Sequence, residues 1–112
     1  MGFDYEYPIK VTRVIDGDTF VCDIDLGLEI HLKNQKIRLL GVDAYEFNEI
    51  KGKAATLIAE DFLTTGSLTL ITPGKRDSFG RILGNIKKDD RFLKEILMTN
   101  NLTTGRYSNK EN

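Results

Sequence analysis

The alternation of apolar and polar residues in the first part of the chain predicts β-strands. Phe20, Cys22 and Ile24 are apolar and their neighbours are mostly polar, which is typical of a half-buried strand. Asp16-Gly17-Asp18, immediately before this segment, favours a tight hairpin turn. Three strands are predicted in this way. The first is Ile9–Ile15 and the second Thr19–Asp25, and the third runs through Leu28–Leu32 and Lys36–Val42 with a bend at Asn34-Gln35.

Helical spacing enters in the second half of the chain. A helix is predicted over Lys53–Thr65, followed by Gly66, which suits a helix C-terminus. One face of this helix carries the apolar residues Ala54, Ala55, Leu57, Ile58, Ala59 and Phe62. The remaining predicted elements are strands over Ser67–Thr72 and Arg81–Lys87 and a short helix over Phe92–Thr99.

The order of these elements is three strands, a helix, two strands and a helix. This order predicts an α+β fold, a five-stranded Greek-key OB-fold barrel with two helices. A ferredoxin-like fold would need a helix after the first strand, and none is predicted there. We expect a flexible leader over residues 1–8, one barrel domain over 9–107 and a tail over 108–112.

Composition and charge narrow the possible functions. The chain has 112 residues, 40% hydrophobic and 29% charged, which suits one globular domain. No apolar run approaches the roughly 20 residues that cross a bilayer, so we expect no membrane association. The N-terminus lacks the features of a signal peptide, which favours a cytoplasmic protein or the mature domain of a secreted one. The formal net charge is −1, so nucleic-acid binding would need a local cluster of basic residues or a bound divalent cation.

The segment Lys36–Glu46, which reads KIRLLGVDAYE, carries the clearest candidate chemistry. Arg38 lies within an apolar run, where a charge needs an anionic partner or a cleft. Asp43 and Glu46 follow it, and carboxylate oxygens are the ligands that hard cations prefer. This segment therefore offers a phosphate-binding cation, metal-binding oxygens and a candidate base.

Three segments together resemble a known family. VIDGDTF (residues 14–20), IRLLGVDAYE (37–46) and KRDSFGRILG (75–84) are similar to the signature segments of the staphylococcal-nuclease (thermonuclease) family, and the resemblance extends over residues 11–107. It implies an OB-fold endonuclease that hydrolyses phosphodiester bonds of DNA or RNA with Ca²⁺. In such enzymes water attacks phosphorus and O5′ leaves, so that 3′-phosphates remain.

The resemblance also implies roles for individual residues. Asp18, Asp43 and the main-chain carbonyl of Ala44 would bind Ca²⁺, with Asp16 in an outer shell around the ion. The other roles implied are phosphate binding by Arg38 and Arg81, activation of the attacking water by Glu46, and substrate binding by Lys75, Arg76, Phe79 and Tyr107. The planar guanidinium group suits bidentate phosphate binding. Whether Glu46 deprotonates the water or only orients it stays open, because a free glutamate, with a pKa near 4.3, is a weak base.

The chain departs from the family pattern in three places. Tyr45 stands where the family has proline, and Ser78-Phe79 stands where its enzymes carry Lys-Tyr. The chain stops where the family supplies a third, C-terminal helix, so we expect that helix to be absent and a homo-oligomer to cover the gap. These departures leave an alternative open, a catalytically weak or inactive module that binds nucleic acid or protein. Each motif alone also has a simpler interpretation, since Asp-Gly-Asp is common in turns and Asp43 and Glu46 would suit a solvated loop.

Overall fold

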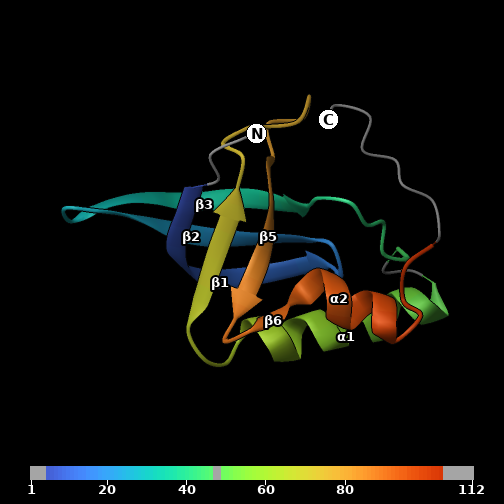
Figure 1. Ribbon diagram of the computed structural model, residues 1–112. Helices are drawn as coiled ribbons and strands as arrows, with labels where there is room; N and C mark the ends of the chain where they lie inside the picture. Colours follow the sequence, from blue (N-terminus) through green and yellow to red (C-terminus); the bar gives the residue numbers. More distant parts are fainter. Residues whose placement is uncertain (1–4, 47–48, 105–112) are drawn as a thin grey trace.

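The computed structural model describes residues 5–46 and 49–104, and its elements follow the predicted order with one addition (Figure 1). They are β1 (Tyr5–Asp16), β2 (Thr19–Gly27), β3 (Ile30–Leu39), α1 (Ile50–Leu63), β4 (Leu68–Thr72), β5 (Ile82–Lys88), β6 (Arg91–Phe92) and α2 (Leu93–Thr99). The short strand β6, which extends β5 as an antiparallel pair, is the element that the pattern missed.

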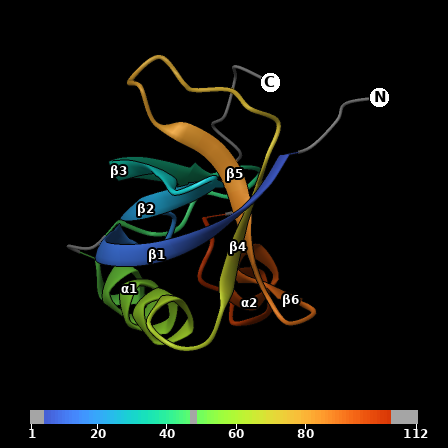
Figure 2. The same ribbon diagram turned by 90° about the vertical axis from the view of Figure 1, so that its left-hand side faces the viewer.

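Strands β1 to β5 form a closed barrel. The sheet order is β3-β2-β1-β4-β5, and parallel pairing of Ile37–Leu39 in β3 with Ile82–Gly84 in β5 closes it (Figure 2). The predicted fold class, an OB-fold-like α+β barrel with two helices, is thereby confirmed. The alternating residues Phe20, Cys22 and Ile24 are buried in the core as expected.

Both helices lie at one end of the barrel (Figure 1), with α1 against β1 and α2 against β5 and α1. The buried residues of α1 are Gly52, Ala55, Thr56, Ala59, Phe62 and Leu63. The predicted apolar face was therefore partly wrong, because Ala54 is exposed and Leu57 is 65% exposed. Helix α1 packs against the barrel with one face only, and these two residues lie on the opposite, solvent-exposed face. Neither helix in the described part of the chain is long and apolar enough to cross a membrane.

Several positions differ from the sequence prediction. Strand β3 begins at Ile30 and ends at Leu39, so Leu28 and Val42 lie outside it, and three further positions also differ. Tyr5–Pro8, which we placed in a flexible leader, belong to β1 and pair with β4. The expected bend at Asn34-Gln35 is a bulge within the continuous strand β3, where Asn34 has φ 57° and its N–H donates to the Asp23 carboxylate at 2.9 Å. Helix α1 begins at Ile50, three residues before the predicted start at Lys53. Long-range pairing and packing decide these positions, and local periodicity does not report them.

Candidate active site

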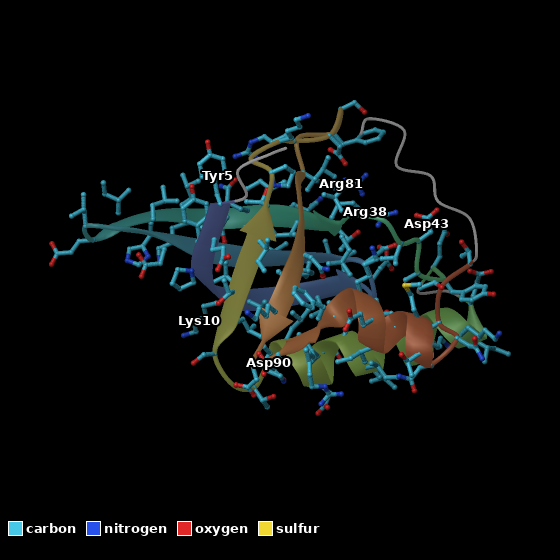
Figure 3. All side chains as sticks on the ribbon, viewed as in Figure 1. Tyr5, Lys10, Arg38, Asp43, Arg81 and Asp90 are labelled. Atoms are coloured by element: carbon cyan, nitrogen blue, oxygen red, sulfur yellow. The ribbon has the colours of Figure 1, made fainter. Side chains whose placement is uncertain are left out.

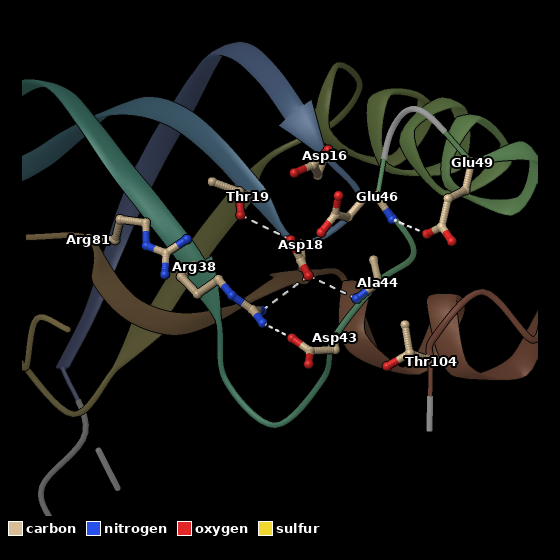
Figure 4. A pocket seen from close by; sticks show the side chains of 10 residues that line it. All are labelled: Asp16, Asp18, Thr19, Arg38, Asp43, Ala44, Glu46, Glu49, Arg81 and Thr104. Atoms are coloured by element: carbon tan, nitrogen blue, oxygen red, sulfur yellow. Dashed lines mark hydrogen bonds and ion pairs between the residues drawn. The ribbon is translucent and has the colours of Figure 1, made fainter. Parts of the chain in front are cut away.

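Segments from several parts of the chain come together at one end of β3 and form an open pocket of about 560 Å³ (Figure 4). In the described part of the chain it is lined by Asp16, Asp18, Thr19, Arg38, Asp43, Ala44, Glu46, Glu49, Arg81 and Thr104. This set contains every residue that we predicted as a metal ligand or catalytic group. The residues come from the β1–β2 turn, from strand β3 and the loop after it, and from the segment before β5. The fold brings them together, and their roles stay predictions.

The turn that carries Asp18 is pressed against helix α1. A Cβ atom at Gly17 would lie 2.9 Å from the Cβ of Ala55 and 3.0 Å from that of Ala44, closer than side chains pack. Glycine at this position therefore lets the turn approach both the helix and the loop after β3. The main-chain carbonyl of Asp18 accepts the Leu39 N–H at 2.9 Å, which joins the turn to the end of β3.

The Asp18 carboxylate is almost buried, with 7% of the residue exposed. One oxygen accepts the Ala44 N–H at 2.8 Å and lies 3.3 Å from an Nη atom of Arg38, and the other accepts the Thr19 hydroxyl at 2.9 Å. Burial raises the pKa of Asp18, against the opposing effects of Arg38, Ala44 and Thr19, and the nearby Asp16 raises it further. The site therefore favours a positive charge beside Asp18.

Arg38 supplies such a charge. It is 9% exposed, and its Nη1 donates to the carbonyl oxygens of Leu39 at 3.0 Å and Val42 at 2.7 Å. Its Nη2 donates to the Asp43 carboxylate. Gly41, with φ 83°, allows the chain to fold back so that Val42 and Asp43 reach the guanidinium group. The expectation that an arginine within this apolar run finds an anionic partner is therefore met twice, by Asp18 and Asp43.

Arg81 has a different environment. Its Nε donates to the Asp77 carboxylate at 2.7 Å, and its Cζ lies 5.3 Å from the centre of the Phe79 ring. Burial alone would raise the pKa of Asp77, but hydrogen bonds from Arg81 and Phe79 hold it below its usual range. Figure 3 shows Arg81 and Arg38 side by side in that view, on the side of the barrel where Asp43 also lies.

Glu46 is exposed at the mouth of the pocket. Its main-chain N–H donates to the Glu49 carboxylate at 3.0 Å, and the Glu49 N–H donates to the Glu46 carbonyl at 2.9 Å. Glu49 is also the residue that precedes α1. The start of the helix thus holds the backbone of Glu46, whose side chain lines the pocket.

The donor set fits a calcium ion only in part. Within residues 5–46 and 49–104, no group of three or more His, Cys, Asp and Glu side chains is placed to hold a metal ion. The predicted set, however, has two carboxylates and a carbonyl. Asp18 and Asp43 both line the pocket and offer hard oxygens, and no described residue donates a hydrogen bond to the Ala44 carbonyl. This chemistry suits Ca²⁺, which accepts oxygen ligands in irregular geometry and completes its shell with water.

The other predicted substrate-binding residues lie outside this pocket. Lys75 and Arg76 line a separate, more apolar pocket of about 290 Å³, and Arg76 donates to the Gly80 carbonyl at 2.9 Å and the Gln35 side chain at 3.0 Å. Phe79 is 81% exposed beside Arg81. Tyr107 and the expected absence of a third helix both lie outside the described residues.

Comparison with known proteins finds two similar chains, and no protein-family model matches. An uncharacterized endonuclease of Escherichia coli is 35% identical over 81 residues, which is 72% of this chain and 48% of that protein. An uncharacterized endonuclease of Escherichia coli O157:H7 is 32% identical over 81 residues, again 72% of this chain and 48% of that protein. The chain thus spans about half the length of the curated relatives it matches.

Sequence reasoning missed four residues at or beside the pocket: Thr19, Glu49, Asp77 and Thr104. Asp77 could have been noticed, because it stands four residues before Arg81 inside the third signature segment. Glu49 stands three residues after Glu46 and shortly before the predicted helix, which is a weaker signal. Thr104 carries none, since its N–H reaches the Asp43 carbonyl, at 2.8 Å, only through the tertiary fold.

Proposed function

We propose that this chain is the nuclease unit of a calcium-dependent endonuclease that hydrolyses phosphodiester bonds of DNA or RNA and leaves 3′-phosphates. The observation that carries the proposal is the convergence of two arginines, two aspartates and a glutamate from separate segments on one pocket. The names of the two relatives, both endonucleases, support the nuclease part. The calcium requirement and the position of cleavage rest on the resemblance and on the chemistry of the pocket.

The charge of the pocket supports the need for a cation. Among the described residues, five carboxylates line it against two guanidinium groups. When ionised, these residues give the pocket three excess negative charges, which would repel a phosphodiester. A calcium ion held by Asp18, Asp43 and the Ala44 carbonyl would offset this charge and polarise a phosphate oxygen. Two arginines alone would not make the pocket attractive to a nucleic-acid backbone.

The residues divide the remaining work. Arg81 binds a non-bridging phosphate oxygen through its Nη groups, and charge that grows on this oxygen in the transition state strengthens the contact. Arg38 holds Asp18 and Asp43 in place and adds positive charge beneath the phosphate. Glu46 accepts a hydrogen bond from a water molecule and orients it towards phosphorus. As the water oxygen bonds to phosphorus, it gives up a proton to solvent. The P–O5′ bond breaks, and the leaving oxygen takes up a proton from solvent.

A digestion assay tests this function. Purified protein would be incubated with a labelled single-stranded DNA oligonucleotide and with its RNA counterpart, in calcium or in excess chelator. We expect cleavage only with calcium, products that end in 3′-phosphate by mass spectrometry, and loss of cleavage in Glu46→Gln and in Arg81→Ala. Glu60→Gln and Arg91→Ala are matched controls, since both residues are exposed and lie away from this pocket.

Each outcome decides something. Cleavage that survives the double variant Glu46→Gln/Arg81→Ala would refute the assigned residues. Cleavage in chelator would refute the calcium requirement. Oligonucleotide binding without cleavage, with calcium present, would favour the alternative of a non-catalytic binding module.

A further inference from the structure

Asp77 is a buried carboxylate in an otherwise exposed loop. The loop connects β4 to β5, and most of its residues are exposed, yet the Asp77 side chain is only 4% exposed. A carboxylate removed from water is costly unless hydrogen bonds replace its hydration. We therefore expect hydrogen-bond donors around the Asp77 carboxylate that replace its lost hydration.

Within the described part of the chain, all of the partners of Asp77 belong to the four residues that follow it. One carboxylate oxygen accepts the N–H groups of Phe79 and Arg81, both at 2.9 Å, and the other accepts the Nε–H of Arg81 at 2.7 Å. The main chain closes the same loop, because the Asp77 N–H donates to the Arg81 carbonyl at 2.8 Å and the Gly80 N–H donates to the Asp77 carbonyl at 3.0 Å. Asp77 thus fixes both the conformation of the loop and the side chain of Arg81.

These contacts leave the outer edge of Arg81 available. Its Nε is bonded to Asp77 and its guanidinium lies beside the Phe79 ring. Within the described part of the chain, its two Nη groups have no hydrogen-bond or ion-pair partner. A long side chain loses rotamer freedom when it binds a ligand, and one that is already held has lost that freedom during folding.

The second arginine of the pocket cannot present the same edge. Both hydrogens of Arg38 Nη1 are directed to the carbonyls of Leu39 and Val42, and Nη2 is bonded to Asp43. Of the two arginines that line the pocket in the described part of the chain, Arg81 is therefore the one whose Nη groups are both available to a phosphate. Its orientation depends on a single carboxylate.

We propose that Asp77 is a positioning residue that holds Arg81 through Nε and so presents its two Nη groups to a phosphate oxygen in the pocket. Asp77 itself touches no substrate. The proposal rests on the proposed nuclease function for its consequence in catalysis, but the positioning contact exists without substrate and can be tested separately.

A double-mutant cycle tests the catalytic consequence. Asn at position 77 keeps one oxygen for the two main-chain N–H groups and replaces the other with an NH₂ group, which cannot accept the Nε–H. We expect Asp77→Asn to lower kcat/KM on the oligonucleotide by roughly 10- to 100-fold, mostly in kcat, as for the loss of a charged hydrogen bond. In the Arg81→Ala background the same change should cost less than about 2-fold, because its target is gone.

Controls separate positioning from folding. Asp90→Asn, an exposed carboxylate outside the pocket, should leave activity unchanged, and circular dichroism should show each variant folded. Full activity in Asp77→Asn would overturn the proposal. An equal loss in both backgrounds would also overturn it, because Asp77 would then act independently of Arg81.

A second readout does not depend on nuclease activity. Arginine Nε–H resonances exchange slowly with water when the group is hydrogen-bonded. We expect a protected Nε–H signal in the wild type that disappears in Arg81→Ala and exchanges rapidly in Asp77→Asn. If the wild type cleaves nothing, the nuclease proposal fails, and this signal alone decides the positioning claim. Rapid exchange in the wild type would refute it.

Discussion

Replacing Arg38 with alanine should destabilise the protein far more than replacing Arg81, although both arginines line the same pocket. Arg38 is 9% exposed and contacts two carboxylates, Asp18 and Asp43, whose side chains are 11% and 19% exposed. The Arg81 side chain is 27% exposed, and its partner Asp77 keeps two main-chain hydrogen bonds without it. Arg38 therefore belongs to the structure of the barrel as well as to the pocket.

The size of the difference follows from burial. Removing one partner of a buried ion pair costs about 3–5 kcal/mol, because the other charge stays buried and unpaired. Arg81→Ala breaks one ion pair instead of two and leaves the buried Asp77 carboxylate with two main-chain hydrogen bonds, so we expect it to cost only about 1 kcal/mol, the contribution of one hydrogen bond whose partner stays satisfied. Since domains of this size are stable by about 5–15 kcal/mol, Arg38→Ala should remove a large part of the total.

Urea unfolding followed by far-ultraviolet circular dichroism measures the contrast. With an m value of about 1.5 kcal/mol/M, the midpoint should fall by about 2–3 M in Arg38→Ala and by less than about 1 M in Arg81→Ala. Arg81→Ala is the matched control, since it removes the same side chain from the same pocket. Midpoints within about 0.5 M of each other would refute the argument that Arg38 neutralises buried carboxylates.

Three further predictions concern other parts of the molecule. Gly17→Ala should destabilise by about 1–3 kcal/mol through overpacking, since its new Cβ would lie 2.9 Å from the Ala55 Cβ, and Ala55→Gly added to it should restore part of the urea midpoint. Hydrogen bonds lower the pKa of Asp77, so its stabilising effect is present above about pH 4 and is lost as pH falls through the lowered pKa. The difference in melting temperature between wild type and Asp77→Asn should therefore shrink below about pH 4. A difference that grows on acidification would contradict this. Burial raises the pKa of the Cys22 thiol to about 12, so a thiol reagent at pH 8 should react with it only after urea unfolding, and rapid reaction of the native protein would show that the thiol is accessible.

Much of the fold could be predicted from local patterns. The alternation of Phe20, Cys22 and Ile24 reports a strand with one face in the core, and the Asp16-Gly17-Asp18 turn reports where it starts. These signals are local, because a side-chain period and a turn conformation depend on adjacent residues. The barrel class followed from the order of such elements. The pairing of Tyr5–Pro8 with β4 did not, because these residues form strand hydrogen bonds only with a segment that is distant in the sequence.

The candidate site divides in the same way. Sequence alone determined which residue types were present in three short motifs, and hence that carboxylates and arginines were available for phosphate chemistry. Only the tertiary structure decided their states: Arg38 is committed to Asp18 and Asp43, whereas Arg81 is held by Asp77 with its outer edge available. A contact such as the Ala44 N–H to Asp18 joins residues 26 positions apart. No local pattern encodes such a contact, because it forms only when turn, strand and loop meet at the end of a closed barrel.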